Sequence, residues 1–135
     1  MKEKAISENH LYRKAYAGGR RAVSKTVAVY VLKDRRKEAL KKANPKKTAI
    51  NRVGISASKK IGGAVERNRA KRVIREAYRQ LDTGIGIKKG YLVVIVARTA
   101  ATTEKMQSVF CDLRHCLKKV DLLFKPEEAE NNDNA

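Results

Sequence analysis

Tryptophan is absent from this chain of 135 residues, and phenylalanine, proline, cysteine and methionine occur only twice each. Two cysteines are too few for a disulfide framework, which agrees with a reducing compartment. The N-terminus has no apolar core of the kind that a secretory signal needs, so we expect a cytoplasmic protein. Because there is also no long apolar run and no lipidation motif, we expect no membrane partner.

Acidic side chains are scarce as well, because 14 Asp and Glu stand against 32 Lys and Arg, a formal net charge of +18. Residues 126–135 carry four acids and no base, so the preceding residues carry +22. A compact chain with this charge repels itself unless its partner is a polyanion, and nucleic acid is the leading candidate. We expect one RNA-binding domain over 1–125 and an acidic disordered tail over 126–135.

Residues that support catalysis or metal binding are few. Cys111, His115 and Cys116 are close in sequence, but on a helix Cys116 falls on the core stripe while the other two share a flank. No fourth ligand is evident, and the spacing matches no usual zinc pattern. Gly62-Gly63 precedes a basic helix, but the Walker pattern is absent. We therefore expect no catalytic residue, no metal site and no organic cofactor.

Hydrophobic periodicity predicts alternating helices and strands. Strand patterns cover 22–32, with a candidate break at Ser24-Lys25, then 50–58 and 91–97. Helical patterns cover 7–17, the stretch after Gly62-Gly63, and a last helix that starts at Thr102 or Thr103. This order predicts an α+β sandwich with helices packed on one face of a single sheet.

Residues 33–48 break this pattern, with eight bases against two acids. Pro45 argues against one continuous helix. We interpret the segment as a basic mobile loop with a helical turn near Glu38-Ala39-Leu40. A solvated linker without a specific role is the simpler interpretation of any single lysine in it.

Residues 59–79 hold eight Lys or Arg and only two Glu. With Ile74 at the centre of the buried face, a helical wheel also buries Ala70, Ala77, Tyr78 and Leu81. The remaining positions divide into an outward patch and a stripe nearer the apolar edge: Asn68, Arg69, Arg72, Arg75 and Arg79 against Arg67 and Lys71. A solvated helix would show mixed charges with i, i+4 pairs, which are almost missing, so we interpret this helix as a nucleic-acid surface.

Tyr12 and Tyr16 are four residues apart and project from one face of the first helix. Half-buried core tyrosines are an equally good interpretation of that spacing. If Tyr30 converges with them, however, aromatic rings beside a basic rim would suit the unstacked bases of single-stranded RNA. No helix-turn-helix, zinc-finger or basic-zipper pattern favours DNA.

The basic stretch resembles the signature of the protein component of bacterial ribonuclease P. The resemblance is carried by Lys59-Lys60-Ile61-Gly62-Gly63-Ala64-Val65, followed by Arg67-Asn68-Arg69-Ala70-Lys71-Arg72. Other positions of this family pattern are matched by Tyr12, Tyr16, Gly19, Tyr30 and Arg75. The similarity covers roughly residues 5–124. The basic segment 33–48 and the acidic tail depart from the compact family pattern and receive no role from it.

The resemblance implies a four-stranded sheet with three helices, similar to the second domain of ribosomal protein S5, with a left-handed βαβ crossover. It implies that an RNA subunit, with Mg2+, catalyses removal of the 5′ leader from precursor tRNA, and that one protein binds each RNA subunit. The implied contacts with the RNA subunit are Lys59, Lys60, Arg67, Asn68, Arg69, Lys71, Arg72 and Arg75. The implied contacts with the leader are Tyr12, Tyr16, Tyr30, Arg67 and Lys71.

Two other functions fit the residues. A ribosomal or other structured-RNA scaffold protein would explain the charge and the S5-like elements equally well. A protein-only nuclease would need metal-dependent cleavage by the purified protein.

Overall fold

The computed structural model describes residues 4–6, 9–46 and 49–124, and the predicted tail over 126–135 lies outside the described residues. In chain order it contains β1 (Lys4–Ala5), α1 (Asn9–Gly18), β2 (Arg20–Val23), β3 (Val27–Lys33), α2 (Lys37–Ala43), β4 (Arg52–Ser56), the 3-10 helix η1 (Lys59–Ile61), α3 (Ala64–Thr83), β5 (Tyr91–Ala97), the 3-10 helix η2 (Thr99–Thr102) and α4 (Met106–Lys119). The α+β class is confirmed, and the first predicted strand is divided at Ser24-Lys25 into β2 and β3.

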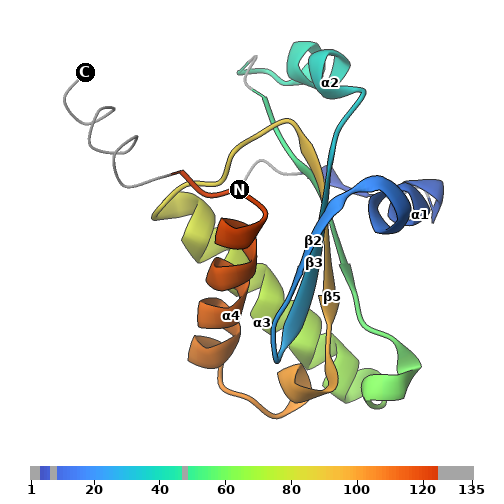
Figure 1. Cartoon of the computed structure of the whole chain (residues 1–135), viewed down its shortest axis with the longest axis vertical. Coiled ribbons are helices and arrows are strands. Elements are labelled where there is room, and N and C mark those ends of the chain that lie inside the picture. The colour runs from blue at the N-terminus through green and yellow to red at the C-terminus, as the bar shows by residue number, and fades with distance from the viewer. Residues whose placement is uncertain (1–3, 7–8, 47–48, 125–135) are drawn as a thin grey trace.

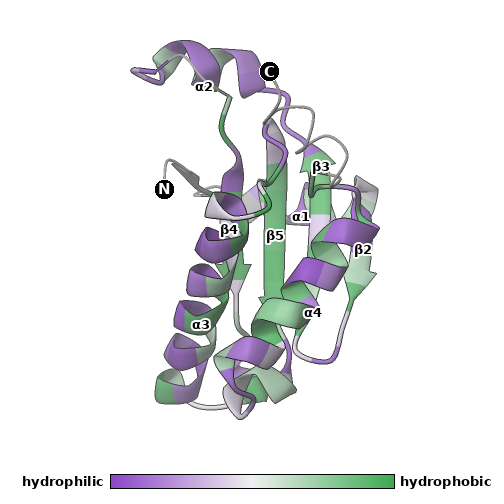
Figure 2. Ribbon diagram, turned by 90° about the vertical axis from the view of Figure 1, so that its left-hand side faces the viewer, coloured by the Kyte–Doolittle hydropathy of each residue, from purple (hydrophilic) through white to green (hydrophobic). Residues whose placement is uncertain are grey.

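The strands form one mixed sheet in the order β1-β4-β5-β3-β2 (Figure 1). β4 runs parallel to β5, and β3 is antiparallel to both β5 and β2. β1 pairs through two residues only, so the predicted four-stranded sheet gains a short edge strand. In Figure 2, β4 and β5 run downward with β5 to the right and the connecting α3 in front, which makes this crossover left-handed.

Helices cover both faces of the sheet, so the prediction of helices on one face is wrong (Figure 1). α3 and α4 pack on one face, against side chains such as Val29, Val93 and Ile95. α1 covers the opposite face, where Leu11 and Ala15 pack with residues such as Leu92 and Val94. Because β3 and β5 carry apolar side chains on both sides, each side needs a covering layer. We call these the α3/α4 face and the α1 face.

The outer side of α3 is hydrophilic, as Figure 2 shows. Its inner side buries the residues that the helical wheel predicts. Its buried residues are Ala70, Ile74, Ala77, Tyr78 and Leu81. Among the residues that the structure describes, no helix is both long enough and apolar enough to cross a membrane.

The last helix, α4, begins at Met106, and the predicted start at Thr102 or Thr103 is wrong. Thr99–Thr102 form η2 instead, and the Arg69 guanidinium donates hydrogen bonds of 3.0–3.3 Å to the carbonyls of Ala101, Thr102 and Glu104. These carbonyls would accept the first intrahelical bonds of a helix that began at Thr102. The contact from α3 therefore holds the segment that precedes α4.

The basic segment 33–48 contains α2, so the loop prediction is wrong for Lys37–Ala43. Leu40 is buried and anchors the helix. The helix ends at Ala43, because Asn44 precedes Pro45 and the residue before a proline disfavours the helical conformation. The helix is longer than the single turn expected near Glu38-Ala39-Leu40. The mobility of the segment stays a prediction.

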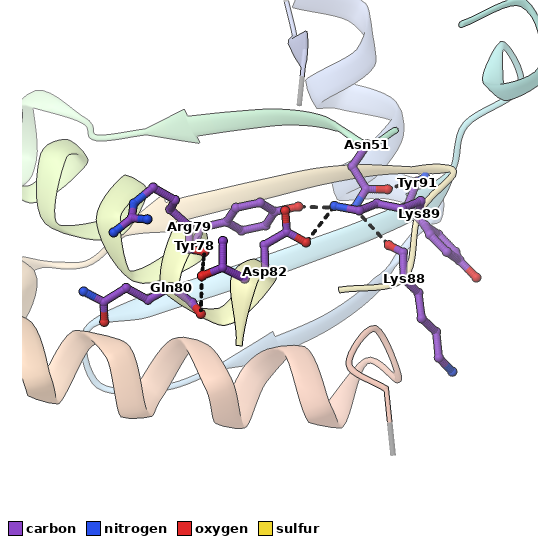
Figure 3. A network of polar contacts seen from close by, with 9 residues as sticks. Asn51, Tyr78, Arg79, Gln80, Asp82, Lys88, Lys89 and Tyr91 are labelled. Carbon is purple, nitrogen blue, oxygen red and sulfur yellow. Dashed lines mark hydrogen bonds and ion pairs between the residues drawn. The ribbon is translucent and has the colours of Figure 1, made fainter. Parts of the chain in front are cut away.

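A buried asparagine joins the start of β4 to the loop that precedes β5 (Figure 3). Asn51 donates to the Tyr78 hydroxyl at 3.2 Å and to the Lys88 carbonyl at 2.9 Å, and it accepts from the Tyr91 amide at 3.0 Å. Lys89 and Asp82 form an ion pair of 2.7 Å beside it. Because a buried amide costs free energy unless it is paired, this network holds α3, the loop and both parallel strands in one arrangement.

Candidate nucleic-acid interface

The three predicted tyrosines converge on the α1 face. The rings of Tyr16 and Tyr30 meet edge to face with centroids 4.8 Å apart. Tyr12 lies over Gly54 of β4, where a Cβ atom would come within 2.7 Å of the Tyr12 Cζ. Burial raises the pKa of Tyr16, a hydrogen bond with Ser56 opposes that shift, and the neighbouring tyrosines add to it. Tyr16 is still 42% exposed, so this aromatic cluster is open to a ligand.

The register of the sheet arranges the floor of this cluster in rows. Gly54 pairs with Val94, which pairs with Tyr30. In the next row Arg52 pairs with Leu92, which pairs with Leu32. Side chains at alternate positions of a strand share a face, so both rows lie under α1. The small residues Gly54 and Ser56 leave the space above β4 to Tyr12 and Tyr16.

A buried ion pair closes the second row. Arg52 Nε lies 2.7 Å from Asp34 Oδ2 and its Nη2 lies 2.8 Å from Oδ1, a two-point contact between side chains that are 6% and 0% exposed. The Arg36 amide also donates to Asp34 Oδ1 at 2.9 Å. Burial alone would raise the pKa of Asp34, but the hydrogen bonds from Arg52 and Arg36 outweigh it and lower that pKa. Asp34 is therefore an ionised anchor for the start of β4.

The cations of the basic stretch differ in what they contact. Asn68, Arg72 and Arg75 are exposed on the outer side of α3, and Lys59 and Lys60 are exposed on η1. None of these five has a side-chain partner among the described residues. They form an outer basic surface of the kind that the sequence predicts.

Three arginines of α3 are engaged within the protein. Arg69 holds the η2 segment, as described above, so it does not belong to the freely exposed set. Arg67 Nε donates weakly to the Gly63 carbonyl at 3.4 Å. Arg79 pairs with Glu76, and hydrogen bonds from Arg79 and Gln80 lower the pKa of Glu76 to about 2. The expectation that these bases have almost no partners within the helix is therefore wrong for Arg79.

The tyrosines lie on the opposite side of the sheet from Asn68, Arg72 and Arg75, because α1 and α3 cover different faces (Figure 1). Lys59 and Lys60 lie on η1, beyond the end of β4. Arg67 and Lys71 are half-buried in the N-terminal half of α3, which packs against β4 and η1. Their approach to the tyrosines around the edge of β4 stays a prediction.

The residues considered for zinc do not converge. Cys111 and His115 are exposed on α4, whereas Cys116 is buried with its Sγ 3.0 Å from Ser24 Oγ. In the part of the chain that the structure describes, no three His, Cys, Asp or Glu side chains are grouped to hold a metal ion.

Comparison with known proteins identifies the family behind these surfaces. The family model described as Ribonuclease P matches residues 1–121. The ribonuclease P protein component of Clostridioides difficile is 33% identical over 119 residues, which cover 88% of this chain and 93% of the relative. The chain belongs to the ribonuclease P protein family.

Further members agree with this ribonuclease P assignment. The ribonuclease P protein component of Dehalococcoides mccartyi is 43% identical over 90 residues, which cover 67% of this chain and 72% of the relative. The solved structure of the Staphylococcus aureus RNase P protein superposes with a TM-score of 0.69 at 26% identity, covering 89% of this chain and 97% of that one. As a ribonuclease P protein, the chain is a subunit of a ribonucleoprotein endoribonuclease with an RNA partner, which decides against the scaffold alternative.

Sequence reasoning missed Gly54, Ser56, Asp34 and Arg52 as residues that shape the site. The signal for the first two was present, because β4 alternates apolar residues with small ones. The Asp34–Arg52 pair joins residues 18 positions apart and has no local sequence signal.

Proposed function

We propose that the protein uses its two surfaces for two RNA contacts within ribonuclease P. The outer basic surface binds the RNA subunit through Lys59, Lys60, Asn68, Arg72 and Arg75, with Arg67, Arg69 and Lys71 beside it. The aromatic cluster binds the single-stranded 5′ leader of precursor tRNA. The observation that carries the proposal is the convergence of Tyr12, Tyr16 and Tyr30 on an exposed part of the sheet.

The chemistry of each surface suits its partner. Arginine forms two-point hydrogen bonds with phosphate. Arginines on an exposed helix face that have no acidic partner can bind the phosphates of a folded RNA without first breaking an ion pair. Tyrosine rings stack on unpaired bases and tolerate different sequences, as leaders of many tRNAs require. We assign no step of the hydrolysis to this chain. In this proposal the RNA subunit holds most of the Mg2+, one protein binds each RNA subunit, and the complex works in the cytoplasm.

Reconstitution tests this function. At low Mg2+, adding the protein to the RNA subunit should raise the rate at which the leader is removed from precursor tRNA. The log of substrate affinity should fall with the log of salt concentration, by roughly 0.7 per phosphate contact with a single strand. Absence of stimulation at every Mg2+ concentration would reject the proposal.

Two substitutions separate the contacts. Tyr30→Ala should weaken binding of leader-bearing substrate by about 1–3 kcal/mol, since it removes a stacking ring, and should leave RNA-subunit binding unchanged. Arg72→Ala should weaken RNA-subunit binding and leave the effect of the leader unchanged. Equal loss of both properties in both variants would show that the surfaces do not act separately.

A further inference from the structure

A pocket of about 290 Å³ lies on the α1 face, between the start of α1 and the segment that leads from β3 into α2. Its apolar walls are Leu11, Leu32 and Leu92. This pocket is separate from the cluster of Tyr12, Tyr16 and Tyr30. It is bordered by residues 33–36, which belong to the basic segment 33–48 for which the sequence suggests no role.

The pocket carries a large excess of positive charge. Among its described lining residues, five side chains are Lys or Arg and one carboxylate is present, that of Asp34. That carboxylate is already occupied by Arg52 and by the Arg36 amide. Among the described residues, the four remaining cations are exposed and donate no side-chain hydrogen bond, although Arg36 also interacts electrostatically with Asp34: Lys14, Lys33, Arg35 and Arg36. Such a site selects an anion, because like charges at its mouth repel one another until a counter-charge arrives.

The pocket continues the floor of the tyrosine cluster. Leu32, Leu92 and Arg52 form the row of the sheet next to Tyr30, Val94 and Gly54. Adjacent rows on one face are two residues apart along a strand, which is about 7 Å. α1 covers both rows, with Tyr12 over Gly54 and Leu11 and Lys14 at the pocket. A single-stranded RNA whose bases stack on the tyrosines therefore reaches the pocket within a short stretch of its own backbone.

We propose that this pocket extends the leader site and binds the phosphates of the nucleotides next to those that stack on the tyrosines. The four cations take the phosphates, while the leucine walls contact sugar or base. The inference rests on the proposed function, because it needs a leader on the α1 face. A pocket of this volume has room for about one nucleotide, and its leucine walls can contact a base only where that base is unpaired, which favours the single-stranded leader over a paired part of either RNA.

The test measures the affinity of the reconstituted holoenzyme for precursor tRNAs whose leaders lengthen one nucleotide at a time. Wild type should gain affinity once the leader passes the tyrosines. Lys14→Ala/Arg35→Ala should lose that gain and bind short-leader substrate as wild type does. Its salt slope on long leaders should be smaller by about 1.4, at 0.7 per lost contact. Lys14→Arg/Arg35→Lys, which keeps the charge, should retain the gain.

The matched control is Arg114→Ala/Lys118→Ala, which removes two exposed cations from α4 on the other face and should keep the full gain with leader length. Circular dichroism would check that each variant is folded. If Tyr30→Ala weakens short-leader binding but Lys14→Ala/Arg35→Ala equals wild type at every length, the pocket inference is wrong and the proposed function stands. If the pocket variant loses the same factor at every length, its cations bind another part of the RNA. Should neither leader length nor Tyr30→Ala matter, the proposed function itself fails.

Discussion

The two faces of the sheet use the same strands for different purposes. Among the described residues, the α3/α4 face has one cluster of 21 buried residues, whereas the cluster under α1 has five. The α1 face leaves its remaining cover to Tyr12, Tyr16 and Tyr30, all of which keep solvent contact. Because burial of apolar area is the main stabilising term, most of the folding free energy comes from the α3/α4 face. The α1 face therefore keeps partly exposed aromatic rings and cations at its surface.

The largest effect should come from the Asp34–Arg52 ion pair, which is both charged and buried on the α1 face. Arg52→Ala leaves the Asp34 carboxylate without its main partner, and loss of one member of a buried ion pair typically costs about 3–5 kcal/mol. Chemical denaturation at pH 7 should show this loss. Arg72→Ala, an exposed arginine of the same charge, should change the free energy of unfolding by less than about 0.5 kcal/mol. Equal stability of the two variants would mean that the α1 face contains no stabilising anchor.

The same ion pair predicts a pH dependence. The pKa of Asp34 is lower in the folded protein than in the unfolded chain, so its stabilisation is present above the unfolded pKa and is lost as pH falls through the folded value. Asp34→Asn imitates the protonated acid. Its deficit in unfolding free energy relative to wild type should therefore be full at pH 7 and shrink below about pH 4. A deficit that stays constant with pH would contradict this account.

A pair of truncations tests the contrast between the faces directly. Leu113 is fully buried on the α3/α4 face, and Leu113→Ala should lower the free energy of unfolding by about 2–5 kcal/mol. Once folded, that variant should bind leader normally. Tyr30→Ala should do the reverse, with a smaller loss of stability and weaker leader binding. The comparison fails if both truncations lower stability and leader affinity in the same proportion.

Sequence reasoning succeeded where one local signal dominates. The run over 91–97 predicted β5 with the bounds that it has, and the spacing in α3 predicted its buried face around Ile74. The four-residue spacing of Tyr12 and Tyr16 is a local property and correctly predicted one shared face of α1, and these tyrosines converge with Tyr30 as expected.

It failed where a contact between distant residues decides the outcome. The segment before α4 is held by Arg69, which is more than 30 residues away in sequence. The position of α1 was missed because apolar residues on both sides of β3 permit cover on either face. The ion pair between Asp34 and Arg52 was missed as well, because α2 lies between the two residues in sequence. The sequence of that segment resembles a solvated linker and gives no sign that its two ends meet.

The smallest effect separates two arginines that the family signature places three residues apart. Arg69 is bound to carbonyls of the η2 segment, while Arg72 is exposed without a partner. Arg69→Ala should therefore lower the free energy of unfolding by about 1 kcal/mol, a typical net value for lost hydrogen bonds. It should also increase amide hydrogen exchange in residues 99–104, because the carbonyl contacts that order this segment are gone.

Arg72→Ala should change neither quantity and should weaken RNA-subunit binding more than Arg69→Ala does when the two variants are compared at equal concentrations of folded protein. If Arg69→Ala leaves stability and exchange unchanged while weakening RNA binding as much as Arg72→Ala, then Arg69 leaves its carbonyl partners to bind RNA. The outer basic surface would then reach the edge of the α3/α4 face.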